Sequence, residues 1–240
     1  MKSVGDKISA NSGAWSFGGS VAKNFNDHVS KSVPLYNEGH EMIVDLSEFF
    51  VSKNSVVYEL GCSTGTLISK VAERNSANRK AIFYGIDCEK NMVVHAKKLA
   101  KKRRQSGNVI FKKDDIRKMQ FKMCDLVICY YTVQFIRPAF RQNILSKIYQ
   151  TLNWGGALIM FEKVRGADAR FQDILTTLYN EYKLRKGYTC NEIIDKTRSL
   201  KGVLEPFSSQ ANLDMLKRAG FTDVNSIQKY LCFEGFLAIK

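Results

Sequence analysis

The stretch SVVYELGCSTG, residues 55–65, joins a strand to a glycine turn. Val56 and Val57 supply the β-branched bulk of a buried strand, which stops at Gly61. Beyond Gly65 the apolar residues recur at helical spacing, so a helix follows the turn. A strand, a glycine loop and a helix in this order form the opening unit of a doubly wound α/β fold that binds a nucleotide-like ligand.

The glycine loop narrows the choice of ligand. It contains neither the G-x-G-x-x-G of dinucleotide sites nor the G-x-x-x-x-G-K-[ST] of phosphate-binding loops. It resembles the E/D-x-G-x-x-x-G of S-adenosylmethionine (SAM) methyltransferases, with Glu59, Gly61 and Gly65 at the fixed positions. Asp87 ends the next predicted strand, where a ribose-binding carboxylate is expected. A turn that only packs a helix would explain the loop alone, but the loop with Asp87 favours SAM as the cofactor.

The length and composition suit a single domain with a full core. The chain has 240 residues and 45% hydrophobic content. We expect one SAM-binding domain over residues 1–240, with N-terminal helices in 14–52 and a helical cap in 165–202. Residues 1–13 are small and polar, and we expect them to be loosely ordered.

The cysteine pattern, the hydropathy and the net charge indicate the compartment of the protein and its possible partners. None of the six cysteines forms a C-x-x-C pair, so we expect reduced thiols, no metal site and a cytoplasmic location. No apolar run approaches the length of a membrane helix, and the first 13 residues lack the apolar region of a secretory signal. The net charge of +14 is compatible with nucleic acid or another polyanion as a partner.

Strands and helices are predicted to alternate along most of the chain, which implies a parallel sheet with helices on both faces. The helical pattern from Trp15 to Phe50 is interrupted at Pro34. The last two strands follow each other closely and should form an antiparallel hairpin at the sheet edge. This is the Rossmann-like, seven-stranded class I methyltransferase arrangement. Strands are predicted at 55–61, 81–87, 108–113, 124–130, 156–163, 222–229 and 231–239, and helices at 65–74, 89–105, 138–152 and 208–219.

The cap interrupts this alternation. Residues 165–202 stand where a short connection would suffice, after the fifth predicted strand. Because ligands bind at the carboxyl edge of such sheets, the cap should lie over the site. It carries nine Lys/Arg against five Asp/Glu over residues 163–201, which favours an anionic acceptor. Its apolar residues form one helical stripe, made of Phe171, Ile174, Leu175, Leu178, Tyr179 and Tyr182.

Several segments together resemble the carboxy-S-adenosylmethionine synthase family, whose members use SAM and prephenate in tRNA wobble-uridine modification. The similarity extends from Trp15 to the end of the chain. It implies the class I methyltransferase fold and a homodimer with the cap near the subunit boundary. The segments are S-V-P-L-Y at 32–36, Y-E-L-G-C-S at 58–63, T-V-Q-F at 132–135, K-I-Y-Q-T-L-N at 147–153, G-G-A-L at 155–158 and E-K at 162–163.

The resemblance also assigns SAM contacts, residue by residue. They fall on a tyrosine before the first strand, on the glycine loop, on the pair that ends the second strand and on the pair beside the adenine. The matching residues here are Tyr36, Gly61, Cys62, Ser63, Asp87, Cys88, Asp115 and Ile116.

Two positions depart from the family pattern. The family has an asparagine where this chain has Tyr130, and a carboxylate-binding arginine where the ungapped match places Thr197. Arg198 follows one step later, which on a helix turns a side chain by roughly a quarter turn. A carboxylate without a cationic partner would be poorly held. These departures predict that the chain binds SAM but does not make carboxy-SAM from prephenate.

Candidates for the chemistry itself are few. Tyr130 and Tyr131 could line the pocket beside the sulfonium, or could simply pack the end of a buried strand. Glu162 and Lys163 could polarise an acceptor, although a solvated ion pair is the favoured interpretation. Arg198 is a further weak candidate.

The histidines and the basic run give weaker evidence for a functional role. Among the histidines only His40 is kept as a possible base, because it follows Tyr36 by one helical turn. The basic run at 97–104 ends a predicted helix that leads away from the ligand edge. We therefore interpret it as a solvated helix end.

Three functions remain open on the sequence. The first is a SAM-dependent methyltransferase with an unidentified acceptor, for which the basic cap favours an anion. The second is a carboxy-SAM synthase that uses SAM and prephenate. The third is a non-catalytic SAM-binding protein, and the complete glycine loop with Asp87 argues against it.

Overall fold

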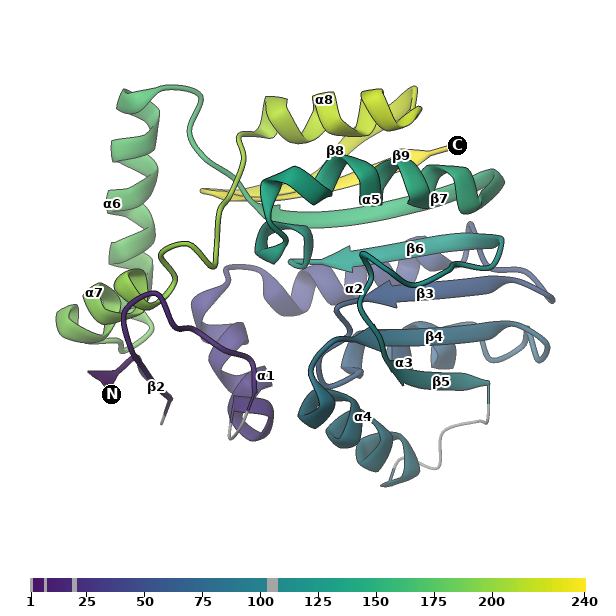
Figure 1. Cartoon of the computed structure of the whole chain (residues 1–240), viewed down its shortest axis with the longest axis horizontal. Coiled ribbons are helices and arrows are strands. Elements are labelled where there is room, and N and C mark those ends of the chain that lie inside the picture. The colour runs from purple at the N-terminus through teal and green to yellow at the C-terminus, as the bar shows by residue number, and fades with distance from the viewer. Residues whose placement is uncertain (1, 7, 19–20, 103–107) are drawn as a thin grey trace.

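A seven-stranded sheet forms the centre of the molecule (Figure 1). The computed structural model describes residues 2–6, 8–18, 21–102 and 108–240. The strand order is β5-β4-β3-β6-β7-β9-β8, in which β9 is antiparallel to β7 and β8 and the other pairs are parallel. This confirms the predicted fold class and the terminal hairpin. The strands are β3 (Val56–Leu60), β4 (Ile82–Asp87), β5 (Val109–Lys113), β6 (Cys124–Tyr130), β7 (Leu152–Lys163), β8 (Asp223–Tyr230) and β9 (Phe233–Ile239).

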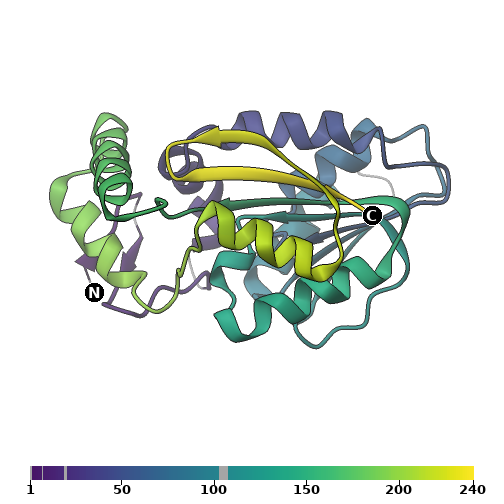
Figure 2. The same cartoon turned by 90° about the horizontal axis from the view of Figure 1, so that it is seen from above.

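Helices cover both faces of this sheet, as Figure 2 shows from above. On one face, α2 (Tyr36–Ser47), α3 (Thr66–Arg74) and α4 (Lys90–Lys102) pack on the side chains that alternate strand positions direct toward them. On the other face, α5 (Pro138–Thr151) and α8 (Ser209–Ala219) do the same. Val57 belongs to the first cluster and its neighbour Tyr58 to the second, which illustrates this alternation.

The predicted boundaries of the sheet strands and of their connecting helices agree with the structure within one or two residues, apart from two elements. The helical pattern predicted from Trp15 to Phe50 is longer than the helices themselves, since α1 (Val21–Ser32) begins after Trp15 and α2 ends at Ser47. Strand β7 begins at Leu152, four residues before the prediction, and its pairing with β6 shifts register between Cys124 and Leu126. Helix α4 is described to Lys102, so the last predicted residues of that helix and part of the basic run lie outside the described residues. No helix in the described part of the chain is long and apolar enough to span a bilayer.

The N-terminal segment is ordered, contrary to the sequence-based expectation. Two short strands, β1 (Lys2–Ser3) and β2 (Ser9–Ala10), pair as an antiparallel hairpin. Val4 and Ile8 are buried in a small cluster with Trp15 and Met92. The hairpin contacts the cap, since Ser3 donates a hydrogen bond to Glu192. The apolar side chains of this mostly polar stretch thus pack against residues that are distant in the sequence.

The cap stands beyond the carboxyl ends of the parallel strands, next to α1 (Val21–Ser32) (Figures 1 and 2). It consists of α6 (Ala169–Arg185) and α7 (Cys190–Ser199). Its apolar stripe is only partly buried. Leu175 and Tyr179 pack against the core, whereas Phe171, Ile174 and Leu178 are exposed by 56%, 49% and 39%.

Candidate functional site

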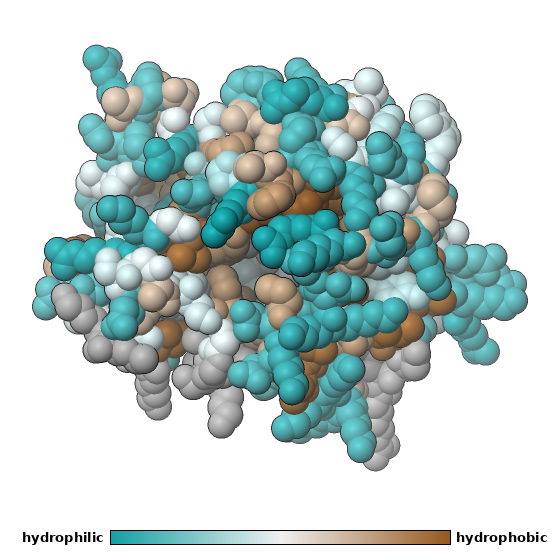
Figure 3. Space-filling view, in the orientation of Figure 1, coloured by the Kyte–Doolittle hydropathy of each residue, from teal (hydrophilic) through white to brown (hydrophobic). Residues whose placement is uncertain are grey.

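A cavity of about 760 Å³ lies between the carboxyl edge of the sheet and the cap. Figure 3 shows the surface hollowed in this region, with hydrophobic side chains among hydrophilic ones. We call the part lined by Glu59, Gly61, Ser63 and Asp87 the loop half. The part lined by Lys163, Lys183, Lys196 and Arg198 is the cap half. The volume falls within the roughly 300–1,000 Å³ of small-molecule sites, and it allows a nucleoside cofactor with a small second ligand.

The glycine loop has the geometry that its two glycines require. Gly61 has φ 77°, and a Cβ there would collide with the side chain of Thr132. Gly65 has φ 71°, and a Cβ there would collide with Phe111 and Ala96. Gly65 therefore serves helix packing, which was the alternative interpretation of the loop. Gly61 turns the chain into the cavity.

Two acidic side chains border the loop half. Glu59 is buried and accepts a hydrogen bond from the N–H of Ile68 at 2.9 Å, and burial raises the pKa of Glu59 to about 8. Asp87 accepts the N–H groups of Ser63 and Glu89, each at 2.8 Å. Each carboxylate oxygen of Asp87 keeps a second acceptor position, so ribose hydroxyls can still be bound there.

Three tyrosines form a wall of the cavity. The ring of Tyr36 lies 5.1 Å from that of Tyr130 and 6.4 Å from that of Tyr131, between ring centroids. The hydroxyl of Tyr130 donates to the carbonyl of Tyr36 at 2.6 Å, so it offers no free polar group to a ligand. The hydroxyl of Tyr131 is buried and has no hydrogen-bond partner within the described residues. An aromatic wall with an unpartnered hydroxyl suits a sulfonium-bearing ligand such as SAM.

The cavity brings together most of the residues that the sequence indicated, but not all. Cys62 is buried in the core beside Phe111, and Ile116 packs on the opposite face of the sheet. The carboxylate of Asp115 pairs with Arg117 at 2.6 Å. None of these three side chains lines the cavity. The predicted residues that do are Tyr36, Glu59, Gly61, Ser63, Asp87, Cys88, Tyr130, Tyr131, Lys163 and Arg198.

The interpretation of Glu162 and Lys163 as a solvated ion pair was wrong. Successive residues of a strand point to opposite faces, so the two side chains part. Glu162 is buried and accepts the N–H of Val133 at 3.0 Å, and burial raises its pKa to about 8. Lys163 points into the cavity, and burial lowers its pKa.

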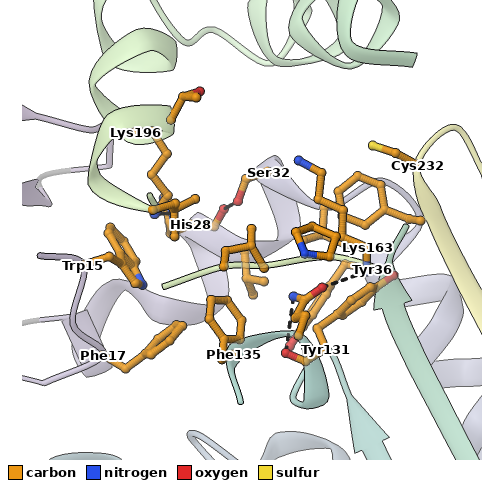
Figure 4. A pocket seen from close by; sticks show the side chains of 18 of the residues that line it. Trp15, Phe17, His28, Ser32, Tyr36, Tyr131, Phe135, Lys163, Lys196 and Cys232 are labelled. Carbon is orange, nitrogen blue, oxygen red and sulfur yellow. Dashed lines mark hydrogen bonds between the residues drawn. The ribbon is translucent and has the colours of Figure 1, made fainter. Parts of the chain in front are cut away.

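The choice among the histidines also needs correction. His40 is buried against the rings of Tyr36 and Tyr130 and does not line the cavity. His28, which the sequence gave no reason to select, lines the cap half. Its Nε2 lies 3.1 Å from Nζ of Lys196 (Figure 4).

Three lysines enter the cap half, and the sequence analysis missed two of them. Nζ of Lys163 and Nζ of Lys183 lie 4.5 Å and 4.4 Å from the ring centroid of Tyr179. Lys196 lies against the ring face of Trp15. In the described part of the chain, none of the three lies within 4.0 Å of a carboxylate. Burial lowers the pKa of Lys183 to about 8 and that of Lys196 to about 6.

The two cap residues weighed from the sequence are less enclosed. Thr197 uses its hydroxyl to donate to the carbonyl of Ile193 at 2.9 Å. The side chain of Arg198 is 62% exposed at the rim and lies 3.6 Å from Asp195. The signal for Lys196 was its spacing, because it follows buried Ile193 by three residues on the same face of α7.

Comparison with known proteins agrees with this geometry. A methyltransferase domain model matches residues 57–156. A carboxy-S-adenosyl-L-methionine synthase of Staphylococcus epidermidis is 35% identical over 220 residues, covering 92% of this chain and 94% of the relative. The same enzyme of Campylobacter jejuni is 38% identical over 224 residues, covering 93% of each chain. The chain belongs to the carboxy-S-adenosyl-L-methionine synthase family.

Solved structures place this family member in the class I methyltransferase fold. An O-methyltransferase family protein from Burkholderia thailandensis superposes with a TM-score of 0.64 at 15% identity, covering 91% of this chain and 59% of that one. A magnesium protoporphyrin IX methyltransferase from Synechocystis, solved with bound S-adenosylhomocysteine (SAH), gives 0.60 at 17% identity, covering 88% and 86%. The protein is thus a SAM-dependent transferase of the methyltransferase type.

Proposed function

We propose that the protein combines SAM with a small carboxylate-bearing co-substrate, and that its product is carboxy-SAM with prephenate as the second substrate. The family membership supports the reaction. The observation that carries the proposal is the set of three lysines in the cap half. The product would then serve tRNA wobble-uridine modification, the pathway that the resemblance implies.

The charge of the cavity divides along its length. Asp87 and Glu89 line the loop half, where the positively charged sulfonium and the ribose of SAM would lie. Lys163, Lys183 and Lys196 line the cap half. An ammonium group buried without a carboxylate is costly, so these lysines favour a ligand that brings negative charge. Prephenate carries two carboxylates, and the cap half can give each of them a cationic partner.

Lysine side chains could take the place of the arginine that Thr197 replaces. A carboxylate in the cap would then not lack a cationic partner. Lys196 on the preceding position of α7 and Lys183 on α6 both line the cap half. The chain can therefore have lost the family arginine and still offer amines that a bound carboxylate would keep protonated.

We propose that SAM is held by the loop half. SAM supplies a carbon activated by its sulfonium, so the protein has mainly to align the reactants. Asp87 would accept the ribose hydroxyls, and Gly61 and Ser63 would let the ligand approach the backbone. Tyr36 and Tyr131 would face the sulfonium, because cations are attracted to aromatic faces. Cys88, which also lines the cavity, would border the nucleoside.

Incubation with SAM and prephenate, followed by mass spectrometry of the small molecules, tests the proposal. We expect carboxy-SAM to accumulate over many turnovers. The double variant Lys183→Met/Lys196→Met should lose this product while its affinity for SAH stays within twofold. A wild-type protein that binds SAM and yields no carboxy-SAM would overturn the proposal.

Methyl transfer to an anionic acceptor is the second candidate. Thr197 and Tyr130 favour it, because they replace two polar residues of the family pattern and Tyr130 uses its hydroxyl internally. The same experiment separates the two reactions, since methyl transfer leaves SAH rather than carboxy-SAM.

We further propose a homodimer and a cytoplasmic location. The exposed apolar stripe of Phe171, Ile174 and Leu178 on α6 supports a second copy of the chain as its partner. All six cysteines are free thiols, which supports a reducing compartment.

A further inference from the structure

Three titratable side chains are linked in a row at the cap end of the cavity. Oδ2 of Asp6 is 2.7 Å from Nδ1 of His28, and Nε2 of His28 is 3.1 Å from Nζ of Lys196. These residues come from the N-terminal hairpin, from α1 and from α7. Figure 4 shows Lys196 extending from α7 toward His28 and Trp15. The loop half, in which we place SAM, does not include them.

Asp6 determines where the protons lie in this row of side chains. Burial alone would raise the pKa of Asp6, but hydrogen bonds from Tyr188, Lys31 and His28 hold it below its usual value. Asp6 therefore stays ionised and can only accept, so Nδ1 of His28 carries the proton. Nε2 is then the acceptor, and Lys196 donates one N–H to it. Burial, with Lys196 nearby, lowers the pKa of His28 to about 4, so the ring is neutral at pH 7.

Only the ring face of Trp15 favours the charged form of Lys196 at close range, and no carboxylate of the described residues lies within 4.0 Å of its amine. From other elements, His28 contacts it, and the charges of Asp6 and Lys183 act on it. Lys31 and Tyr188 bind the carboxylate of Asp6. On α7 itself, Glu192 and Asp195 are already engaged, with Thr189 and Arg198 respectively. Burial lowers the pKa of Lys196 to about 6, Asp6 counteracts part of this, and Lys183 adds to it. The amine is therefore mostly uncharged at pH 7 in the ligand-free protein, and it lines the cavity between the ring of Trp15 and His28.

We propose that the cap half binds a carboxylate anion together with one proton, which Lys196 takes up. The inference rests on the proposed function, because it concerns the second ligand of the same site. A carboxylate beside Nζ favours the charged form, as an opposite charge does for any ionisable group. The proton comes from solvent and ends on Nζ, and no bond of the ligand breaks. His28 stays neutral and keeps Lys196 directed at the ligand in both states.

Calorimetry measures this proton directly. Prephenate is titrated into the protein saturated with SAH, which prevents turnover, in two pH 7 buffers with different ionisation enthalpies. We expect the heats to differ by the uptake of close to one proton for each anion bound. At pH 5, where Lys196 already carries its proton, the two buffers should give the same heat. Equal heats at pH 7 would refute the inference.

Variants assign the proton to its residue. Lys196→Met should abolish the buffer dependence at pH 7 and weaken prephenate binding at least tenfold, with SAH affinity unchanged. Lys186→Met, an exposed lysine of the same cap outside the cavity, should behave as wild type. The pKa of Lys183 is higher, at about 8, so this amine is already mostly protonated at pH 7. Lys183→Met should therefore weaken prephenate binding but keep most of the proton uptake.

The outcomes separate this inference from the proposed function. Prephenate binding without proton uptake, or uptake that persists in Lys196→Met, refutes the inference alone. Failure of prephenate to bind the SAH-loaded protein overturns the proposed co-substrate and the inference together. SAH affinity in each variant reports whether the protein is folded.

Discussion

The carboxylate of Asp87 joins the two loops that border the loop half of the cavity. One oxygen accepts the N–H of Ser63 in the glycine loop, and the other accepts that of Glu89, which directly precedes α4. The residue is only 8% exposed, so neither N–H has water as a ready substitute. Asp87 thus contributes to the fold of the site as well as to its proposed contact with ribose.

Asp87→Asn should affect both functions. The amide keeps one acceptor and sets an N–H against one of the two backbone donors, which leaves a buried donor unsatisfied. We expect the free energy of unfolding to fall by about 1–3 kcal/mol and the SAM dissociation constant to rise at least tenfold. Urea unfolding and calorimetry measure these changes. Asp114→Asn, at an exposed position after the neighbouring strand, is the matched control. An unchanged dissociation constant would show that Asp87 does not contact SAM.

Lys196 should make the stability of the ligand-free protein depend on pH. Its pKa is about 6 in the folded protein and near 10.4 in an unfolded chain. Between these values the unfolded state binds more protons, so stability rises with pH. The contribution of one such group is at most about 1.4 kcal/mol per pH unit. Urea unfolding from pH 6 to pH 9 should therefore show Lys196→Met gaining stability relative to wild type at pH 6 and losing most of that advantage by pH 9. Parallel curves for the two proteins would contradict this assignment.

At the scale of elements, α7 presents Lys196 and Arg198 to the cavity, and its first turn is held by a reciprocal cap. The hydroxyl of Thr189 accepts the N–H of Glu192 at 3.3 Å, and Glu192 accepts the N–H of Thr189 at 3.0 Å. This capping box satisfies donors that a helix start otherwise leaves free. Loosening it should disturb the cap half and leave the loop half intact.

Thr189→Ala tests this separation. Losing the cap should cost about 1 kcal/mol in the free energy of unfolding. Prephenate affinity in the SAH-loaded protein should fall severalfold, and SAH affinity should not change. Thr177→Ala provides the control, since Thr177 is an exposed threonine of α6 whose hydroxyl donates to the carbonyl of Asp173 in the same helix. Equal losses of prephenate and SAH affinity would mean that the cap and the loop are not separable.

The sequence predicted the sheet and its helices because their residues repeat at the periods of strand and helix. It could not predict the β1–β2 hairpin, whose two-residue strands have no period and whose Val4 and Ile8 are buried by distant segments. The loop half could also be predicted, since Gly61 and Asp87 belong to one local motif. The cap half could not be predicted. His28 and Lys196 are 168 positions apart, and only the tertiary fold places them together.

At the scale of the whole molecule, the cap exposes a stripe of large apolar side chains that the monomer does not cover. Phe171, Ile174 and Leu178 recur at helical spacing on α6, and Ile194 of α7 is 47% exposed. A contiguous apolar surface of this kind usually marks an interface. The proposed homodimer would use it as the contact between its two copies of the chain.

Light scattering at micromolar concentration should therefore report a mass near twice 27.3 kDa. The double variant Ile174→Glu/Leu178→Glu should be monomeric, because a dimer would bury its new charges without partners. Its SAH affinity should be unchanged, since the loop half lies elsewhere. Val94→Glu, at an exposed apolar position of α4, should remain dimeric. A wild-type protein that is monomeric under these conditions would refute the dimer.

The hydrogen bond from Ser3 to Glu192 closes a loop of 189 residues. A ribosome that adds roughly 5–20 residues per second makes Glu192 roughly 10–40 s after Ser3. The first-made segment therefore spends most of synthesis without the helix that orders it. The glycine loop and β4 are complete much earlier. A nascent chain that stalls before α7 would carry the loop half of the cavity without the cap half, so anion binding is acquired only near the end of translation.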